Sequence, residues 1–179
     1  MKVYIIWLIG VILWNFGFPN AIPAADVVAA ILLFWYNITM HENFYHNVKV
    51  YYEDTDAGGV VYYANYLKYL ERARTEALAS IGLSNLQIKE KFGALIIVKS
   101  CNIDFKKSAL LEDNLNIRSF VKSITKTSFL MHQFITKDQT PIVDAQVHLV
   151  FVNEKGKPIK VPELIFNNFK PYFCDTIKL

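Results

Sequence analysis

Cysteine is scarce in this chain of 179 residues, which contains only Cys101 and Cys174. Two cysteines form one bridge at most, so the sequence lacks the disulfide framework that stabilises many small secreted domains. Dense runs of lysine and arginine are also missing, and the formal net charge is only +3. This charge is compatible with a phosphorylated ligand but gives no basis for nucleic-acid binding. We therefore expect free thiols and no nucleic-acid partner.

Several sequence signatures of catalysis are missing as well. The chain has no Gly-x-Ser-x-Gly nucleophile elbow, no P-loop and no His-Glu-x-x-His zinc motif. The four histidines lack the spacing of metal ligands; they are His41, His46, His132 and His148. Cys101 has no activating group near it in the sequence, which argues against a cysteine nucleophile. Any enzymatic activity must therefore use another catalytic group.

Charge is nearly missing from residues 1–39, where only Lys2 and Asp26 are charged. The other 140 residues carry 18 of the 19 basic groups and 15 of the 16 acidic groups. Such a break in composition indicates a domain boundary. Because the segment after Met40 has ordinary soluble character, we divide the chain into an apolar extension over 1–39 and one domain over 40–179.

Two interpretations of the extension stay open. Its apolar runs cover residues 3–18 and 24–36, with Pro19 and Pro23 between them. A membrane-spanning helix needs about 20 apolar residues, so the first run is marginal and the second is short. A signal peptide is disfavoured, because no clean cleavage site follows. The extension is either an anchor, which would attach a cytoplasmic protein to the inner membrane, or a mis-annotated start or dispensable segment before Met40.

The pattern after Met40 predicts one long helix and several strands. Apolar residues at intervals of three and four predict an amphipathic helix over 61–81, ended by Gly82. Segments rich in Val, Ile, Phe and Thr, or with alternating polarity, predict strands over 46–53, 92–105, 115–123, 127–136 and 141–153, and a short helix is expected over 162–169. One helix across one curved antiparallel sheet is the simplest way to bury these faces, which makes the fold class α+β.

The most specific segment is 50–66, VYYEDTDAGGVVYYANY, which runs into the helix. From spacing alone, Asp-Thr-Asp before a glycine pair is most often a turn or a helix cap. Gly58 and Gly59 also let the backbone approach a ligand closely. The helix start offers unpaired N–H groups and the positive end of the helix dipole, which suit a developing negative charge.

This segment, together with the continuation LKYLERARTEAL, resembles the signature of the 4-hydroxybenzoyl-CoA thioesterase family, within it the branch associated with the Tol-Pal system. The resemblance covers residues 43–170. It implies a hot-dog fold, with a curved sheet wrapped around the long helix, and self-association through sheets into a homodimer or homotetramer. It also implies hydrolysis of acyl-CoA or acyl-carrier-protein thioesters to a carboxylic acid and a thiol, without metal or cofactor.

The resemblance assigns roles to individual residues. Asp56 matches the catalytic aspartate, which acts as nucleophile or as general base, and the Tyr63 N–H matches the oxyanion donor. Asp54 is expected to stabilise the loop. The residues expected to contact substrate are Gly58, Gly59, Val60, Asn65 and Tyr66.

One departure affects the substrate more than the reaction class. Many members of the Tol-Pal branch have histidine where this chain has Tyr63, and a side-chain role of that histidine is therefore in doubt here. Two rival functions remain. A hot-dog hydroxyacyl-thioester dehydratase needs a histidine, but none lies between Asn47 and Met131. A non-catalytic, membrane-tethered acyl-binding scaffold is favoured if residues 1–39 are an anchor.

Overall fold

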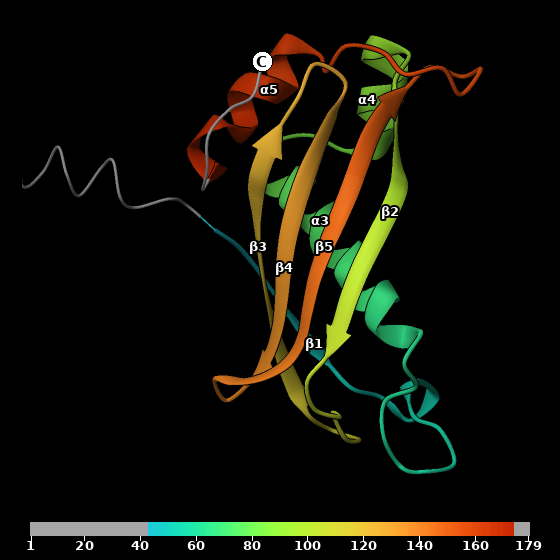
Figure 1. Ribbon diagram of the computed structural model, residues 1–179, viewed down its shortest axis with the longest axis vertical. Coiled ribbons are helices and arrows are strands. Elements are labelled where there is room, and N and C mark those ends of the chain that lie inside the picture. The colour runs from blue at the N-terminus through green and yellow to red at the C-terminus, as the bar shows by residue number, and fades with distance from the viewer. Residues whose placement is uncertain (1–42, 174–179) are drawn as a thin grey trace, which may run out of the picture. The chain divides into compact units, whose positions relative to one another are not determined.

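Five strands form a single antiparallel sheet in the order β1-β3-β4-β5-β2, in a computed structural model that describes residues 43–173 (Figure 1). The predictions for residues 1–39 and for Cys174 lie outside the described residues. The strands are β1 (Phe44–Lys49), β2 (Leu95–Phe105), β3 (Asn114–Ile124), β4 (Ser128–Lys137) and β5 (Thr140–Val152). The α+β class is therefore confirmed.

The turn between β4 and β5 shows how local sequence sets the sheet register. Asp138 and Gln139 have positive φ values of 47° and 66°, and Lys137 pairs with Thr140 on either side of them. Two successive residues with positive φ form the type of two-residue turn whose twist matches that of the flanking strands. This hairpin fixes β4 against β5, the central pair of the sheet.

The long helix α3 (Asn65–Ser80) packs along one face of this sheet (Figure 1). Its buried stripe follows the helical period and contains Tyr66, Tyr69, Leu70, Ala73, Ala77 and Leu78. The predicted helix over 61–81 is confirmed, although it begins at Asn65. Val61 instead makes a strand-like pair with Thr55, which holds residues 61–64 outside the helix. Gly82, with φ of 75°, follows the end of α3 as expected.

Other elements differ from the predictions in instructive ways. The strand expected over 46–53 stops at Lys49, and Tyr52–Asp54 forms the 3₁₀ turn η1. A second helix, α4 (Asn85–Phe92), was not predicted, since its eight residues are too few to give a clear period. Its signals are the Ser84 side chain, which accepts a hydrogen bond from the Gln87 N–H at 3.1 Å, and Gly93 with φ of 57°.

The C-terminal part covers one end of the sheet. The helix expected over 162–169 is confirmed as α5 (Glu163–Phe169), and it is followed by the 3₁₀ turn η2 (Lys170–Tyr172). In the part of the chain that the structure describes, no helix has the length and apolar character required to cross a membrane.

Tyr66 joins α3 to the segment that follows β2. Its hydroxyl oxygen accepts a hydrogen bond from the Ala109 N–H at 3.0 Å, and Ala109 is fully buried. Removal of this hydroxyl would leave a buried N–H without an acceptor, which costs about 1–3 kcal/mol.

We therefore expect Tyr66→Phe to lower the free energy of unfolding by about 1–3 kcal/mol in a urea titration. Tyr52→Phe is the control, because Tyr52 is 82% exposed and should change stability little. Equal stability of the two variants would contradict the structural role of this hydrogen bond.

Candidate active site

A tight loop between Thr55 and Val61 carries the predicted catalytic aspartate. The Asp56 N–H donates to the Val60 carbonyl at 2.9 Å, and the Gly59 N–H donates to the Asp56 carbonyl at 3.0 Å. Val60 pairs with Leu110, and the Val61 N–H donates to the Ala109 carbonyl at 2.9 Å. These bonds fix both ends of the loop, so Asp56 stands on a constrained backbone.

The Asp56 carboxylate is exposed and only partly committed to hydrogen bonds. Its Oδ1 accepts the Gly58 N–H at 2.8 Å, which orients the carboxylate over its own turn. Within residues 43–173, no cation forms an ion pair with it, and Oδ2 has no hydrogen-bond donor. One carboxylate oxygen is therefore held by the loop while the other stays available to react.

Glycine is required at positions 58 and 59 for different structural reasons. A Cβ added at Gly58 would lie 3.1 Å from Asp56 Oδ1, a tight contact with the oriented oxygen. Gly59 has φ of 73°, in the left-handed region that residues with a side chain seldom adopt. Gly58 thus gives the carboxylate room, and Gly59 allows the chain to reverse.

Asp54 connects this loop to the start of α3. Its backbone carbonyl accepts the Tyr62 N–H at 2.9 Å and the Asn65 Nδ2 at 3.0 Å. Its carboxylate is buried and accepts the Tyr51 N–H at 2.9 Å. The expected role of Asp54 in stabilising the loop is thereby confirmed.

Tyr69 lies behind this connection. It is fully buried, and its hydroxyl is the single buried side-chain polar atom of the described residues that has no partner in hydrogen-bond geometry. Burial raises the pKa of Tyr69, and the nearby Asp54 carboxylate raises the pKa further. Tyr69 therefore stays protonated beside the Asp54 carboxylate.

The segment just before α3 contains a backbone donor that has no acceptor among the described residues. The Tyr63 N–H has no acceptor among the described residues, and α3 has no side-chain cap at its N-terminus. The neighbouring Tyr63 hydroxyl is the main cause that raises the pKa of Tyr62, and the charge of Asp56 adds to the effect. Asp56 thus contributes to the electrostatic environment of Tyr62, the residue that precedes Tyr63.

Aromatic side chains flank this arrangement. The Tyr63 ring lies 4.7 Å from that of Tyr62 and 6.5 Å from that of Phe105, between ring centroids. Tyr62, Tyr63 and Phe105 are each 44–61% exposed. Sequence reasoning missed Phe105, since it comes from the far end of β2 and only the fold brings it to the motif.

The remaining predicted residues lie at different depths. Gly58 and Gly59 are at the exposed tip of the loop, and Val60 is half-buried. Asn65 and Tyr66 are buried at the helix start, where the Asn65 amide binds the Asp54 carbonyl and the Tyr66 hydroxyl binds the Ala109 N–H.

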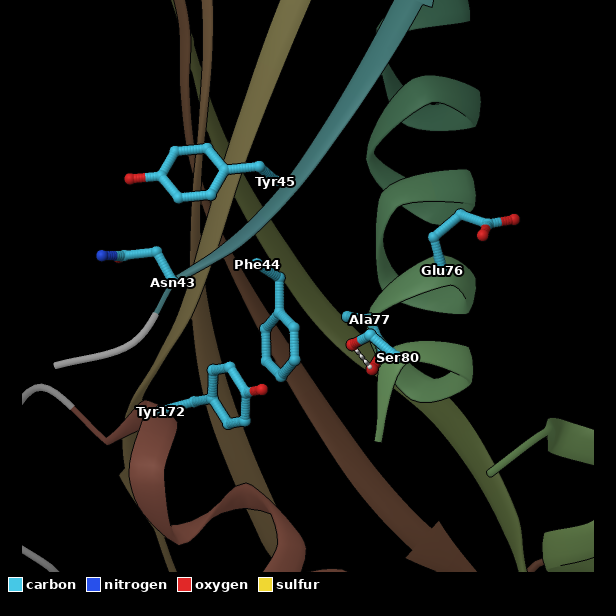
Figure 2. A pocket seen from close by; sticks show the side chains of 7 residues that line it. All are labelled: Asn43, Phe44, Tyr45, Glu76, Ala77, Ser80 and Tyr172. Carbon is cyan, nitrogen blue, oxygen red and sulfur yellow. Dashed lines mark hydrogen bonds between the residues drawn. The ribbon is translucent and has the colours of Figure 1, made fainter. Parts of the chain in front are cut away.

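A surface hollow lies away from this loop. Its volume is about 380 Å³, and it is lined by Asn43, Phe44 and Tyr45 of the β1 side, Glu76, Ala77 and Ser80 of α3, and Tyr172 (Figure 2). Phe44 and Tyr172 stack in it with ring centroids 3.8 Å apart. None of the predicted site residues lines this hollow.

Comparison with known proteins identifies the family. The model of the thioesterase-like superfamily matches residues 50–169, which include the whole loop and α3. The chain belongs to this superfamily. The motif-based resemblance is thus confirmed, and the chain is a thioesterase with the hot-dog fold.

Individual relatives agree with this assignment. The acyl-CoA thioester hydrolase YbgC of Escherichia coli O6:H1 is 38% identical over 125 residues, which cover 69% of this chain and 92% of that protein. A probable thioesterase from Bartonella henselae has a crystal structure with a TM-score of 0.66 and 31% identity, covering 68% of this chain and all of that one. The fold is also that of 4-hydroxybenzoyl-CoA thioesterase from Pseudomonas sp. strain CBS-3, with a TM-score of 0.67, 24% identity and coverage of 70% and 98%.

The contact between Gly58 and Asp56 gives a test of the loop geometry. In Gly58→Ala the new methyl group should displace the Asp56 carboxylate, and we expect thioester turnover (kcat) to fall roughly 10-fold or more, because small misplacements of reacting groups are costly. Ala57→Ser, a similarly small change at the adjacent exposed position, is the control. Unchanged kcat in Gly58→Ala would show that the crowding is relieved without consequence.

Proposed function

We propose that this thioesterase hydrolyses acyl-CoA thioesters to a carboxylic acid and CoA, with Asp56 as the catalytic carboxylate and the Tyr63 N–H as oxyanion donor. One observation carries the proposal. The same loop–helix junction contains a carboxylate oxygen and a backbone N–H that both have no hydrogen-bond partner among the described residues. The acyl-CoA substrate is supported by the names of relatives such as the Escherichia coli enzyme. A thioester of a carrier protein presents the same reacting atoms to this site.

Two routes use this geometry. As a general base, Asp56 Oδ2 accepts a proton from water while the water oxygen attacks the thioester carbonyl carbon. The oxyanion that forms accepts a hydrogen bond from the Tyr63 N–H. Its collapse expels the thiolate, which takes up the proton held by Asp56. As a nucleophile, Oδ2 attacks the carbonyl carbon itself and expels the thiolate, and water then hydrolyses the mixed anhydride. Both routes need the free oxygen and the free N–H.

The exposed aromatic rings provide an apolar surface that the substrate can contact. Tyr62, Tyr63 and Phe105 expose apolar ring area next to Asp56, and such rings bind acyl and pantetheine groups without fixed polar geometry. The departure at Tyr63 is compatible with this proposal, because the backbone N–H does not depend on the side chain.

The dehydratase alternative finds less support. His132 binds Asp144 at 2.6 Å and His148 binds Ser128 Oγ at 3.0 Å, so both rings are engaged within the sheet. His46 lies on β1, opposite Ile117 of β3. A dehydratase would need one of these rings beside Asp56.

Asp56→Asn tests the proposed chemistry. The variant keeps the size of the side chain but removes its basicity and nucleophilic oxygen, so we expect kcat for acyl-CoA hydrolysis to fall at least ~100-fold. KM should change much less, because other substrate contacts are intact. Release of CoA thiol, followed with a thiol-trapping dye, measures both constants.

The matched control is Glu53→Gln, which removes one negative charge from an exposed residue of the same loop. Asp54→Asn does not serve this purpose, because Asp54 is buried and its carboxylate binds the Tyr51 N–H. An equal loss of activity in the Asp56 and Glu53 variants, or near-normal turnover in folded Asp56→Asn, would refute the assignment.

We also propose that the protein forms at least a homodimer through the free edge of β2. Among residues 43–173 this strand pairs only with β5, and most of its length is exposed, including Ile97, Val98 and Phe105. Long apolar strand edges are seldom left open, since they pair with other chains. Two copies paired across a two-fold axis would satisfy the edge in both.

Light scattering of the purified chain at micromolar concentration should therefore give at least a dimer mass. Val98→Lys should shift the mass toward the monomer, because it places a charge on the paired edge. Leu164→Lys is the control, since Leu164 is similarly exposed at 48% but lies on α5. A monomeric wild-type protein would rule out this assembly.

A further inference from the structure

Arg74, in the second half of α3, is a cation that the proposed chemistry does not use. Its side chain is half-buried, and its Nη1 donates a hydrogen bond to Gln133 Oε1 at 2.8 Å. No carboxylate lies within ion-pair distance of the guanidinium among residues 43–173. Because arginine has several further N–H donors, most of them have no protein acceptor here.

The acceptor of the guanidinium is itself held in place. Gln133 is fully buried, and its Nε2 donates to the Leu70 carbonyl at 3.1 Å and to Ser119 Oγ at 2.9 Å. The side chain that fixes Arg74 is thus itself fixed by the helix and by β3. A donor that is pre-oriented in this way loses little conformational entropy when it binds a ligand.

Burial of this charge is unfavourable as it stands. Desolvation lowers the pKa of Arg74, and the charge of Glu71 acts in the opposite direction. A partly desolvated cation without an ion-pair partner among the described residues costs free energy, which an anionic ligand would offset. The arrangement therefore favours an anion at this position.

Next to Arg74 lies an apolar pocket of about 130 Å³. Its walls include Leu78 of α3, Ile96 of β2, Met131 of β4, Leu149 of β5 and Phe169 of α5. An enclosed apolar cavity of about 150 Å³ holds a benzene molecule. This pocket is slightly smaller but lies at the surface, so a short chain or part of a small ring can enter it. The pocket thus combines one cation with a small apolar compartment.

We propose that this pocket binds a short carboxylic acid, with the carboxylate on Arg74 and the apolar tail in the compartment. A guanidinium and a carboxylate match as paired parallel hydrogen bonds, and a short apolar tail on the same molecule would fill the compartment beside Arg74. The inference rests on the proposed function in one respect: the acid is the product class that thioester hydrolysis releases.

Glu71 is expected to weaken the binding of a carboxylate, and its substitution gives a second test of the proposal. It lines the same pocket, and its Oε1 accepts a hydrogen bond from Thr75 Oγ1 at 2.9 Å. Its negative charge repels a bound carboxylate, so Glu71→Gln should tighten the binding. Arg74 and Glu71 variants are therefore expected to act in opposite directions.

Calorimetric titration of the full chain with benzoate and with butyrate tests the proposal, with benzamide as the uncharged probe. We expect both acids to bind, benzamide to bind at least ~10-fold more weakly, and Arg74→Gln to weaken benzoate binding at least ~10-fold, since a charge-assisted bidentate pair is lost. Arg72→Gln, an identical change at an exposed position of the same helix, should bind as the wild type.

Equal binding of benzoate and benzamide, wild-type affinity in Arg74→Gln, or no binding of either acid at millimolar concentration would overturn the proposal. If Arg74→Gln does not fold, as judged by circular dichroism, the Glu71→Gln titration decides: unchanged or weaker benzoate binding would then refute it. The readout does not depend on turnover. Acid binding that persists while Asp56→Asn stays active would instead refute the proposed function alone.

Discussion

The backbone carbonyl of Asp54 is the acceptor on which the arrangement of the site depends. It receives the Tyr62 N–H and the Asn65 amide, and so fastens the residues before Asp56 to the residues before α3. These two bonds add to the Thr55–Val61 bridge, which joins the two ends of the loop. The burial of the Asp54 carboxylate, and the protonated Tyr69 beside it, follow from the need to place this acceptor inside the fold.

The same constraint explains which groups remain reactive. Tyr62 and Asn65 use their donors inside the protein, whereas the next N–H, that of Tyr63, has no acceptor in the described part of the chain. The two carboxylate oxygens of Asp56 differ in a similar way: Oδ1 accepts a hydrogen bond from the Gly58 N–H, and Oδ2 has no donor among the described residues. Groups with and without hydrogen-bond partners therefore alternate along a few residues, and those without a partner are the ones for which we propose a catalytic role.

Much of this could be predicted from the sequence, because the motif is local. The loop, the glycine pair and the helix lie within one continuous segment, so spacing alone places Asp56 before a helix start. The long helix was predicted within a few residues at either end, and the terminal helix was predicted as observed. The boundary errors come from tertiary pairing, since the Thr55–Val61 bridge shortens α3 and η1 replaces the end of the expected first strand.

What the sequence did not reveal depends on contacts between distant positions. Phe105 reaches Tyr63, Gln133 fixes Arg74, and Tyr66 binds Ala109 only because the sheet wraps the helix. Neither periodicity nor spacing contains this information. The short helix α4 was missed for a different reason, since two turns give too weak a pattern.

The continuity of the loop along the chain has an evolutionary consequence. A reactive centre built from one short segment, attached to the rest by a few backbone hydrogen bonds, places few demands on the side chains of the surrounding sheet. Those side chains are then free to diverge as long as they fill the core. The fold shared with 4-hydroxybenzoyl-CoA thioesterase at 24% identity is compatible with such divergence. A change in the surrounding side chains then leaves the loop and its backbone hydrogen bonds in place.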